Sequence, residues 1–449
     1  MTGGGRRVVM LAVIGALLVM LAAGGLALLE RQPVGLASTL RLQAFVASLC
    51  VAGALWLLAV AIVRRGRLPP RAIWLVLAVA VAMRLLTLFA PPVLSSDIYR
   101  YVWDGRVQLA GINPYRDVPA ADELAPLRDA TVYPQINRAD YARTIYPPGA
   151  QAIFALAAMA TPGVFGMKLM IAIFDAVAIG ALIVLLRIAG RDPAELLIYA
   201  WLPLPVWEFA GNAHIDGAAA GLVTLALLAA VRRRWVWTGV LLGFATLTKF
   251  LPVVVLPALW RPWNRWMPAA FALTVVALYL CYATAGWKVL GFLSGYASEE
   301  GFQSGSGIFL LQVLSTAVAL PAWAPKLYVA LVLVVLGGIA VRFAFATPLP
   351  MADGPRVLCQ ARQAAILAAV LLIALSPHYP WYFGWLAPLA CLAPLPGVLW
   401  LLAAAPLLAH GALQYLAVPA AVYGPAIALA ALGAVRALPT SPQIVRSTP

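Results

Sequence analysis

Residues 8–29, VVMLAVIGALLVMLAAGGLALL, form an apolar run of 22 positions without a charge. A helix needs about 20 such residues to cross the hydrocarbon core of a bilayer. The run is longer than the apolar part of a typical secretory signal, so we interpret it as an uncleaved first membrane helix that follows Arg6 and Arg7. Similar runs at 43–63 and 72–92 extend the pattern. Together they predict a polytopic membrane protein.

The composition of the whole chain supports this interpretation. Of its 449 residues, 64% are hydrophobic and only 10% are charged, which excludes an ordinary soluble protein. The net charge of +15 could indicate a nucleic-acid partner, but we favour positively charged anchors on the cytoplasmic side of a membrane. The basic clusters are Arg6–Arg7, 64–71, 187–191 and 232–234. We therefore expect membrane lipids around the chain and no nucleic acid. The four cysteines have neither metal nor redox spacing.

The basic clusters also predict a topology. With them in the cytoplasm, the first three helices leave 93–148 on the extracytoplasmic side, 286–306 becomes a second outer loop, and both termini lie inside. We expect an all-α fold of about 12–13 transmembrane helices in one domain, 1–449. Residues 149–161 are too short to span, and 236–260 forms either one span or two half-helices around Lys249. The remaining spans are expected near 164–187, 193–210, 213–231, 267–285, 324–345, 362–377, 381–395, 396–413 and 415–435.

The first outer segment is unusually acidic. Seven of the 16 acidic residues lie in 93–148: Asp97, Asp104, Asp117, Asp122, Glu123, Asp129 and Asp140. Long connections without a span of their own are usually functional or disordered. The segment is rich in Tyr, Trp and Pro, which argues against disorder. We therefore expect it to carry function.

Within this segment, SSDIYRYVWDG (95–105) places Asp97, Arg100, Tyr101 and Asp104 at helical spacing on one face. Asp97 could cap this helix, form a salt bridge or act as a catalytic base. These three interpretations remain open from the spacing alone.

Aromatic and polar motifs elsewhere favour a sugar-binding surface. Flat rings suit the CH faces of sugars, and carboxylates and amides suit their hydroxyls. The motifs are GINPY (111–115), TIYPPGA (144–150), GNAHID (211–216) and SPHYPWYFGW (376–385). Either histidine alone could be an ordinary interfacial residue. Glu208 and Asp175 lie inside expected spans, where ionisable groups are functional candidates by default. Asp175 could instead pair with a basic residue.

The ordered motifs SSDIYRY, NPY, YPP, GNAHID, LTK and PHYPWY resemble the GT-C superfamily of glycosyltransferases. They are most similar to the bacterial polyprenyl-phosphate-mannose-dependent α-mannosyltransferases. The resemblance implies a GT-C fold in the cell (inner or plasma) membrane, with the active site on the extracytoplasmic face. It implies transfer of a sugar, expected to be mannose, from a polyprenyl-phosphate donor to a glycan, lipid or protein acceptor, with inversion. The rival hypothesis is a transporter or flippase of lipid-linked saccharides, which would gather acids and broken helices near mid-membrane.

The resemblance also implies roles for single residues. Asp97 matches the catalytic position. The candidates for binding the donor phosphate are Arg100, His214, His378 and Lys249, although Lys249 could instead be a cytoplasmic anchor. The expected substrate-binding residues are Tyr101, Asp104, Asn113, Tyr115, Tyr146, Asn212, Asp216, Tyr379, Trp381 and Tyr382. For Asp104 we expect either contact with acceptor hydroxyls or a pair with Arg106.

Two departures from the family pattern bear on these roles. Many members have two adjacent acids at the catalytic position, whereas Ser96 precedes Asp97 here. We therefore expect no cofactor, and a divalent metal stays open. Before the GNAHID turn this chain has LPLP (202–205) where relatives often have Asn-Pro.

Overall fold

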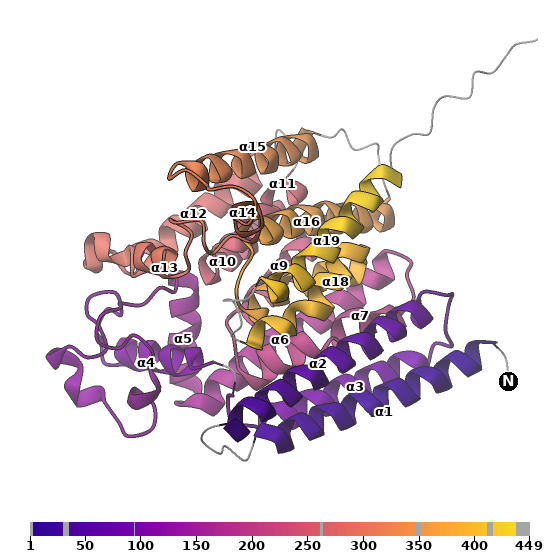
Figure 1. Cartoon of the computed structure of the whole chain (residues 1–449), viewed down its shortest axis with the longest axis horizontal. Helices are drawn as coiled ribbons and strands as arrows, with labels where there is room; N and C mark the ends of the chain where they lie inside the picture. The colour runs from indigo at the N-terminus through magenta and orange to yellow at the C-terminus, as the bar shows by residue number, and fades with distance from the viewer. Residues whose placement is uncertain are drawn as a thin grey trace, which may run out of the picture.

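A computed structural model of the chain describes residues 3–29, 36–93, 95–260, 264–345, 352–410 and 416–436. Every regular element in this part of the chain is a helix (Figure 1). The all-α prediction is confirmed.

The first three helices lie side by side, as Figure 1 shows in indigo and violet. They are α1 (Gly3–Leu29), α2 (Leu36–Val63) and α3 (Ala72–Leu88). Gly15 allows α1 to approach α3 closely, because a Cβ at this position would lie 2.7 Å from Cγ2 of Val79. The three apolar runs predicted from the sequence are thus confirmed as helices.

The N-terminal end of α1 and the turn between α2 and α3 lie at the same end of the molecule. The Arg7 guanidinium donates hydrogen bonds to the carbonyl oxygens of Gly66 and Arg67, at 2.7 and 2.9 Å. Arg67 in turn donates to the carbonyl oxygen of Gly190. Three of the basic clusters named above therefore meet at this end.

The acidic segment after α3 lies at the opposite end of these helices (Figure 1). It contains α4 (Asp97–Leu109) and the 3₁₀ turns η1 (Asp122–Leu127) and η2 (Tyr133–Gln135), and leads to α5 (Pro148–Ala160). A Cβ on Gly105 would lie 2.5 Å from the carbonyl oxygen of Phe154, so α4 packs directly on the backbone of α5. The short helix expected at 149–161 is confirmed as α5.

The next apolar runs are interrupted. After α6 (Val164–Ile188) come η3 (Pro193–Leu196), α7 (Leu197–Ala200), α8 (Pro203–Pro205) and the π-helical η4 (Val206–Gly211), followed by α9 (Asp216–Val231). The continuous helix expected at 193–210 is therefore wrong. Pro203 and Pro205 have no N–H to donate, and a proline ring disfavours helical backbone in the residue before it. The chain bends by 116° between Pro203–Gly211 and Asp216–Val231.

The region around Lys249 is also divided, as one of the two alternatives predicted. The pieces are α10 (Trp235–Thr248), η5 (Leu251–Val255) and α11 (Leu256–Leu259), and Lys249 between them is extended, with φ −152° and ψ 125°. Then α12 (Trp266–Leu280) is followed after a 108° bend by η6 (Ala283–Leu290) and α13 (Leu293–Glu299).

The rest of the chain adds helices around this region. They are α14 (Phe309–Ser315), α15 (Ala324–Phe345), α16 (Asp353–Leu375), η7 (Pro380–Leu386), α17 (Ala387–Leu392), α18 (Pro396–Ala404), η8 (Ala405–His410) and α19 (Ala417–Arg436). Residues 411–415, at the junction of two expected spans, and the C-terminus lie outside the described residues.

The described residues contain six helices long and apolar enough to cross a membrane, or up to eight if each bent pair is one span. The protein is therefore a polytopic membrane protein, but the expected number of 12 or 13 spans is too high by this measure. Shorter apolar helices lie where spans were expected: Ala72–Leu88, Trp235–Thr248 and Pro396–Ala409. Pro148–Ala160 is also shorter than a span, as expected. Of the two alternatives for Asp175, the pair with a basic residue is the one found, since the Arg84 guanidinium contacts both of its oxygens inside the bundle.

Candidate functional site

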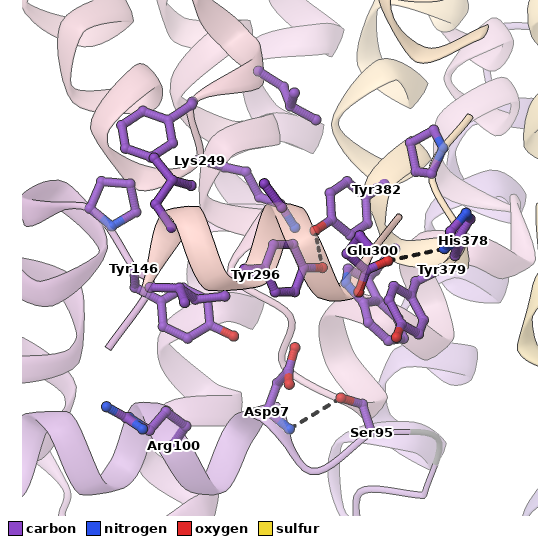
Figure 2. A pocket seen from close by; sticks show the side chains of 18 of the residues that line it. Ser95, Asp97, Arg100, Tyr146, Lys249, Tyr296, Glu300, His378, Tyr379 and Tyr382 are labelled. Atoms are coloured by element: carbon purple, nitrogen blue, oxygen red, sulfur yellow. Dashed lines mark hydrogen bonds and ion pairs between the residues drawn. The ribbon is translucent and has the colours of Figure 1, made fainter. Parts of the chain in front are cut away.

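A cavity of about 560 Å³ lies at the end of the molecule that carries the acidic segment. Five parts of the chain contribute to its wall: the start of α4, the loop 137–147, the break at 248–251, and the segments 293–302 and 375–382. Of the residues expected at a site, the cavity is lined by Asp97, Arg100, Tyr146, Lys249, His378, Tyr379, Trp381 and Tyr382. Figure 2 shows most of these side chains around one space.

Asp97 is the first residue of α4, and its carboxylate points into the cavity (Figure 2). The N-cap position belongs to Ser96, and the backbone N–H of Asp97 donates to Oγ of Ser95 at 3.1 Å. Oδ1 of Asp97 accepts one long hydrogen bond, 3.4 Å, from Nδ2 of Asn137. The carboxylate is thus half-buried, close to the positive end of the α4 dipole, and largely open to a ligand.

Arg100 and Asp104 form a buried pair on the next turns of α4. Nε of Arg100 lies 2.9 Å from Oδ1 of Asp104, and Nη1 donates to the carbonyl oxygen of Ala142. Oδ2 of Asp104 accepts a hydrogen bond from Nε2 of Gln151 at 2.8 Å. Asp104 is 1% exposed and does not line the cavity. In Figure 2 the Arg100 guanidinium points away from Asp97.

Asp104 therefore pairs with Arg100. The pair with Arg106 that the sequence analysis offered as an alternative is wrong. Arg106 lies 2.8 Å from Asp129 instead.

The aromatic residues near α4 form a support behind the cavity. Tyr101 is 1% exposed and packs its ring against Phe154, 4.6 Å away, and edge-on against Tyr146, 4.8 Å away. The Tyr115 hydroxyl donates to the carbonyl oxygen of Tyr146 at 2.7 Å. The amide of Asn113 donates to the Tyr282 carbonyl. Tyr146 lines the cavity, whereas Tyr101, Asn113 and Tyr115 do not.

The GNAHID turn is buried beneath the cavity, and none of its three polar side chains lines it. Asn212 donates to Oε2 of Glu208 at 3.2 Å, and Nδ1 of His214 lies 2.9 Å from the same oxygen. Oδ2 of Asp216 lies 2.9 Å from Nζ of Lys249. The turn thus acts on the cavity through other residues. Lys249 is one of them.

Lys249 does line the cavity, together with Asp97. Its Nζ lies 3.7 Å from the centroid of the Tyr382 ring, within cation–π range. Lys249 therefore lies at the candidate site and not apart from it.

The PHYPWY turn brings two stacked rings to the wall, and His214 stacks behind them. Trp381 lies between Tyr379, 4.6 Å away, and His214, 4.0 Å away, with interplanar angles of 10° and 15°. Burial raises the pKa of the Tyr379 hydroxyl to about 12, and the charge of Glu300 adds to this effect. Tyr379 therefore remains a protonated hydrogen-bond donor at neutral pH.

His378 joins this turn to the second outer loop. Its Nδ1 lies 3.0 Å from Oε2 of Glu300, and its Nε2 lies 2.9 Å from the carbonyl oxygen of Gly307 (Figure 2). A carbonyl oxygen can only accept a hydrogen bond, so Nε2 carries a proton. Both ring nitrogens of His378 are thus occupied.

Several cavity residues were not expected from the sequence. The polar ones include Asn137, Arg138, Arg143, Tyr296 and Glu300. The Tyr296 hydroxyl lies 2.7 Å from that of Tyr382, and Nε of Arg138 lies 2.6 Å from Oε2 of Glu299. Glu299 and Glu300, the two acids of the segment 286–306, could have indicated the contact with Arg138 from the sequence. Nothing in the sequence set Arg143 apart from the other arginines.

In the described part of the chain, no group of three or more His, Cys, Asp or Glu side chains is arranged to hold a metal ion. Asp97 is the acidic residue at the start of α4, and Glu300 across the cavity is engaged by His378.

Comparisons with known proteins relate the chain to one enzyme family. A family model described as alpha-(1->6)-mannopyranosyltransferase, N-terminal domain, matches residues 7–265. Alpha-(1->6)-mannopyranosyltransferase A of Corynebacterium glutamicum is 25% identical over 187 residues, which cover 39% of this chain. The match spans only 36% of the length of that curated relative. No solved structure matches the chain.

The matched residues include Asp97 and Lys249, while Glu300 and the PHYPWY turn follow them along the chain. Since the family model covers more than half of the sequence, the chain belongs to the alpha-(1->6)-mannopyranosyltransferase family.

Proposed function

We propose that this protein transfers a mannosyl residue from a polyprenyl-phosphate donor to an acceptor hydroxyl on the extracytoplasmic face, with inversion. The observation that carries the proposal is the Asp97 carboxylate, which lines the cavity and accepts a single long hydrogen bond. A carboxylate in this condition is available to take a proton, whereas Asp104 is enclosed by Arg100 and Gln151. Family membership supplies the reaction class.

The proposed step is a single displacement. The acceptor oxygen forms a bond to the anomeric carbon while its proton moves to Asp97. The bond between that carbon and the phosphate oxygen breaks on the opposite face, and its electron pair leaves with the polyprenyl phosphate. General base catalysis of this kind contributes about 10²–10⁴-fold to the rate. Asp97 lies at the N-terminus of α4, the end toward which the backbone N–H groups of the first helical turn point.

The ring stack formed by Tyr379 and Trp381 supports a sugar subsite next to Asp97. Aromatic faces suit the CH groups of a pyranose ring, and the protonated Tyr379 hydroxyl offers a donor to its oxygens. Tyr146 contributes to the same wall.

The apolar edge of the cavity supports a lipid donor. Phe250, Leu251 and Leu293 line the cavity, and Phe250 and Leu293 are 36% and 41% exposed at the outer surface of the protein. An isoprenoid chain fits such an edge by the hydrophobic effect and by contact with membrane lipid.

The outer face is supported by the distribution of charge. The Arg7 guanidinium donates to the carbonyl oxygen of Arg67, and Arg67 donates to that of Gly190, at the end of α1–α3 opposite to Asp97. Basic residues are enriched on the cytoplasmic side of membrane proteins. If the basic end of α1–α3 faces the cytoplasm, the cavity lies on the extracytoplasmic side. That side lacks nucleotide sugars, so an activated sugar must arrive there on a lipid.

The test incubates purified protein with an α-(1→6)-linked mannose oligosaccharide and either polyprenyl-phosphate [¹⁴C]mannose or GDP-[¹⁴C]mannose. Transfer from the lipid donor alone, with the anomeric configuration opposite to that of the donor by NMR, is expected. Transfer from the nucleotide sugar alone would contradict the proposal.

A further inference from the structure

This inference rests on the proposed function and concerns the phosphate of the lipid donor. As the sugar leaves, negative charge grows on the phosphate oxygens, which requires a cation with free hydrogen-bond donors. The basic side chains that line the cavity are Arg100, Arg138, Arg143, Lys249 and His378. They differ in how many of their donors are already occupied.

Most of these side chains already have an acidic partner. Arg100 lies 2.9 Å from Asp104, and Lys249 lies 2.9 Å from Asp216. Arg138 and His378 are similarly engaged by Glu299 and Glu300, at 2.6 and 3.0 Å. His214, the remaining candidate from the sequence, is fully buried and does not line the cavity.

Arg143 has no such partner. Its Nε donates to the carbonyl oxygen of Arg116 at 3.0 Å. Within the described residues, neither Nη1 nor Nη2 has a hydrogen-bond partner, and no carboxylate forms an ion pair with this guanidinium. Two parallel N–H donors are therefore free, in the fork geometry that matches phosphate oxygens.

A second cation lies beside Arg143. Nζ of Lys288 lies 3.4 Å from the same carbonyl oxygen of Arg116. Two like charges held at one oxygen repel each other, and an anion bound between them would relieve that repulsion. Lys288 follows Trp287, which is 90% exposed. Exposed tryptophans are typical of the membrane–water interface, the level at which lipid phosphates lie.

The backbone on either side of Arg143 contacts two different parts of the cavity wall. The carbonyl oxygen of Thr144 accepts a hydrogen bond from the backbone N–H of Phe292. The loop at Thr144 therefore lies against the start of α13, next to Leu293. On its other side, the carbonyl oxygen of Ala142 accepts from Arg100 of α4. A phosphate at Arg143 has the apolar edge on one side and the space lined by Asp97 on the other.

We propose that Arg143, supported by Lys288, binds the phosphate of the polyprenyl-phosphate donor. The Arg143 guanidinium contacts two phosphate oxygens through Nη1 and Nη2, and Lys288 adds charge from the membrane surface. The prenyl chain then follows Leu293 and Phe250, and the sugar enters the cavity.

The test measures binding of polyprenyl phosphate, of polyprenol and of inorganic phosphate to the wild type, Arg143→Gln and Lys288→Gln. Loss of a charge-assisted pair of hydrogen bonds is expected to weaken binding of polyprenyl phosphate about 10- to 100-fold in Arg143→Gln. Lys288→Gln, at an exposed position, is expected to weaken it less, about threefold. Binding of polyprenol, which lacks the phosphate, should not change. Inorganic phosphate should compete weakly, because it has no chain.

The matched control is Arg128→Gln. Arg128 lies in the same outer segment and also bonds backbone carbonyls, those of Pro119 and Ala121, but does not line the cavity. It should bind polyprenyl phosphate like the wild type. Unchanged binding in both Arg143→Gln and Lys288→Gln would overturn the inference, as would an equal loss of polyprenol binding. If the wild type transfers no mannose from the lipid donor, it is the proposed function that fails.

Discussion

Asp97 and Asp104 lie two turns apart on α4 but have different surroundings. Asp97 lines the cavity, with one long hydrogen bond from Asn137. Asp104 is 1% exposed, and both of its oxygens are engaged, by Arg100 and Gln151. The helical spacing predicted that both share a face. Gln151 is 47 residues away on α5. No local sequence pattern predicts the contact between Asp104 and Gln151.

Asp104→Asn is expected to act mainly on stability. It removes the charge that compensates the buried guanidinium of Arg100, and breaking a buried pair costs about 3–5 kcal/mol. The midpoint of thermal unfolding in detergent should fall clearly below that of the wild type. Asp117→Asn is the control, because its carboxylate is 25% exposed and 4.0 Å from Arg116, so little change is expected. An unaltered midpoint for Asp104→Asn would show that the pair does not stabilise the fold.

At the scale of helices, close backbone contact between α4 and α5 holds Asp97 in position. A Cβ on Gly105 would lie 2.5 Å from the carbonyl oxygen of Phe154 and 3.0 Å from Cβ of Ala158. Gly180, inside α6, has nothing within 4 Å of the corresponding point. An alanine at Gly105 therefore tests close packing, whereas an alanine at Gly180 tests helix propensity alone.

Gly105→Ala is expected to destabilise the protein by about 1–3 kcal/mol through overpacking, and to lower kcat because α4 must shift. Gly180→Ala should leave activity unchanged and stabilise by up to about 1 kcal/mol, since alanine favours helix over glycine. Thermal unfolding and initial rates for both variants check this. Equal behaviour of the two would contradict the packing of α4 on α5.

The elements that the sequence predicted well are those with uniform apolar runs, such as α1, α6 and α15. The run 193–210 has the same composition but contains Pro203 and Pro205, and it folds as short pieces ending in the π-helical η4. Apolar composition alone does not report such breaks. The polar residue Lys249 did indicate the break between α10 and η5.

For the molecule as a whole, the sequence predicted the helical class and the gathering of polar motifs around one site. It did not separate residues that line the cavity from those behind it. Tyr101, His214 and Asp216 were expected to contact substrate, yet each is buried and instead packs against or pairs with a residue that lines the cavity: Tyr146, Trp381 and Lys249. Such layering depends on contacts between distant segments.

The topology can be tested with single cysteines in a variant that lacks the four natural ones. Asn137→Cys and Ser304→Cys, both exposed, should react with an impermeant maleimide in intact cells if 93–148 and 286–306 lie outside. Pro70→Cys, exposed in the basic turn between α2 and α3, should react only after the membrane is opened. Protection of the first two positions in intact cells would reverse the proposed orientation.

The central claim is that Asp97 is the base, and the turnover of Asp97→Asn tests it most directly. Asparagine keeps the size of the side chain and the contact with Asn137 but cannot take a proton from the acceptor. With polyprenyl-phosphate mannose as donor, kcat should fall by about 10²–10⁴-fold, while polyprenyl phosphate binds as it does to the wild type. A kcat close to that of the wild type would contradict the assignment of Asp97.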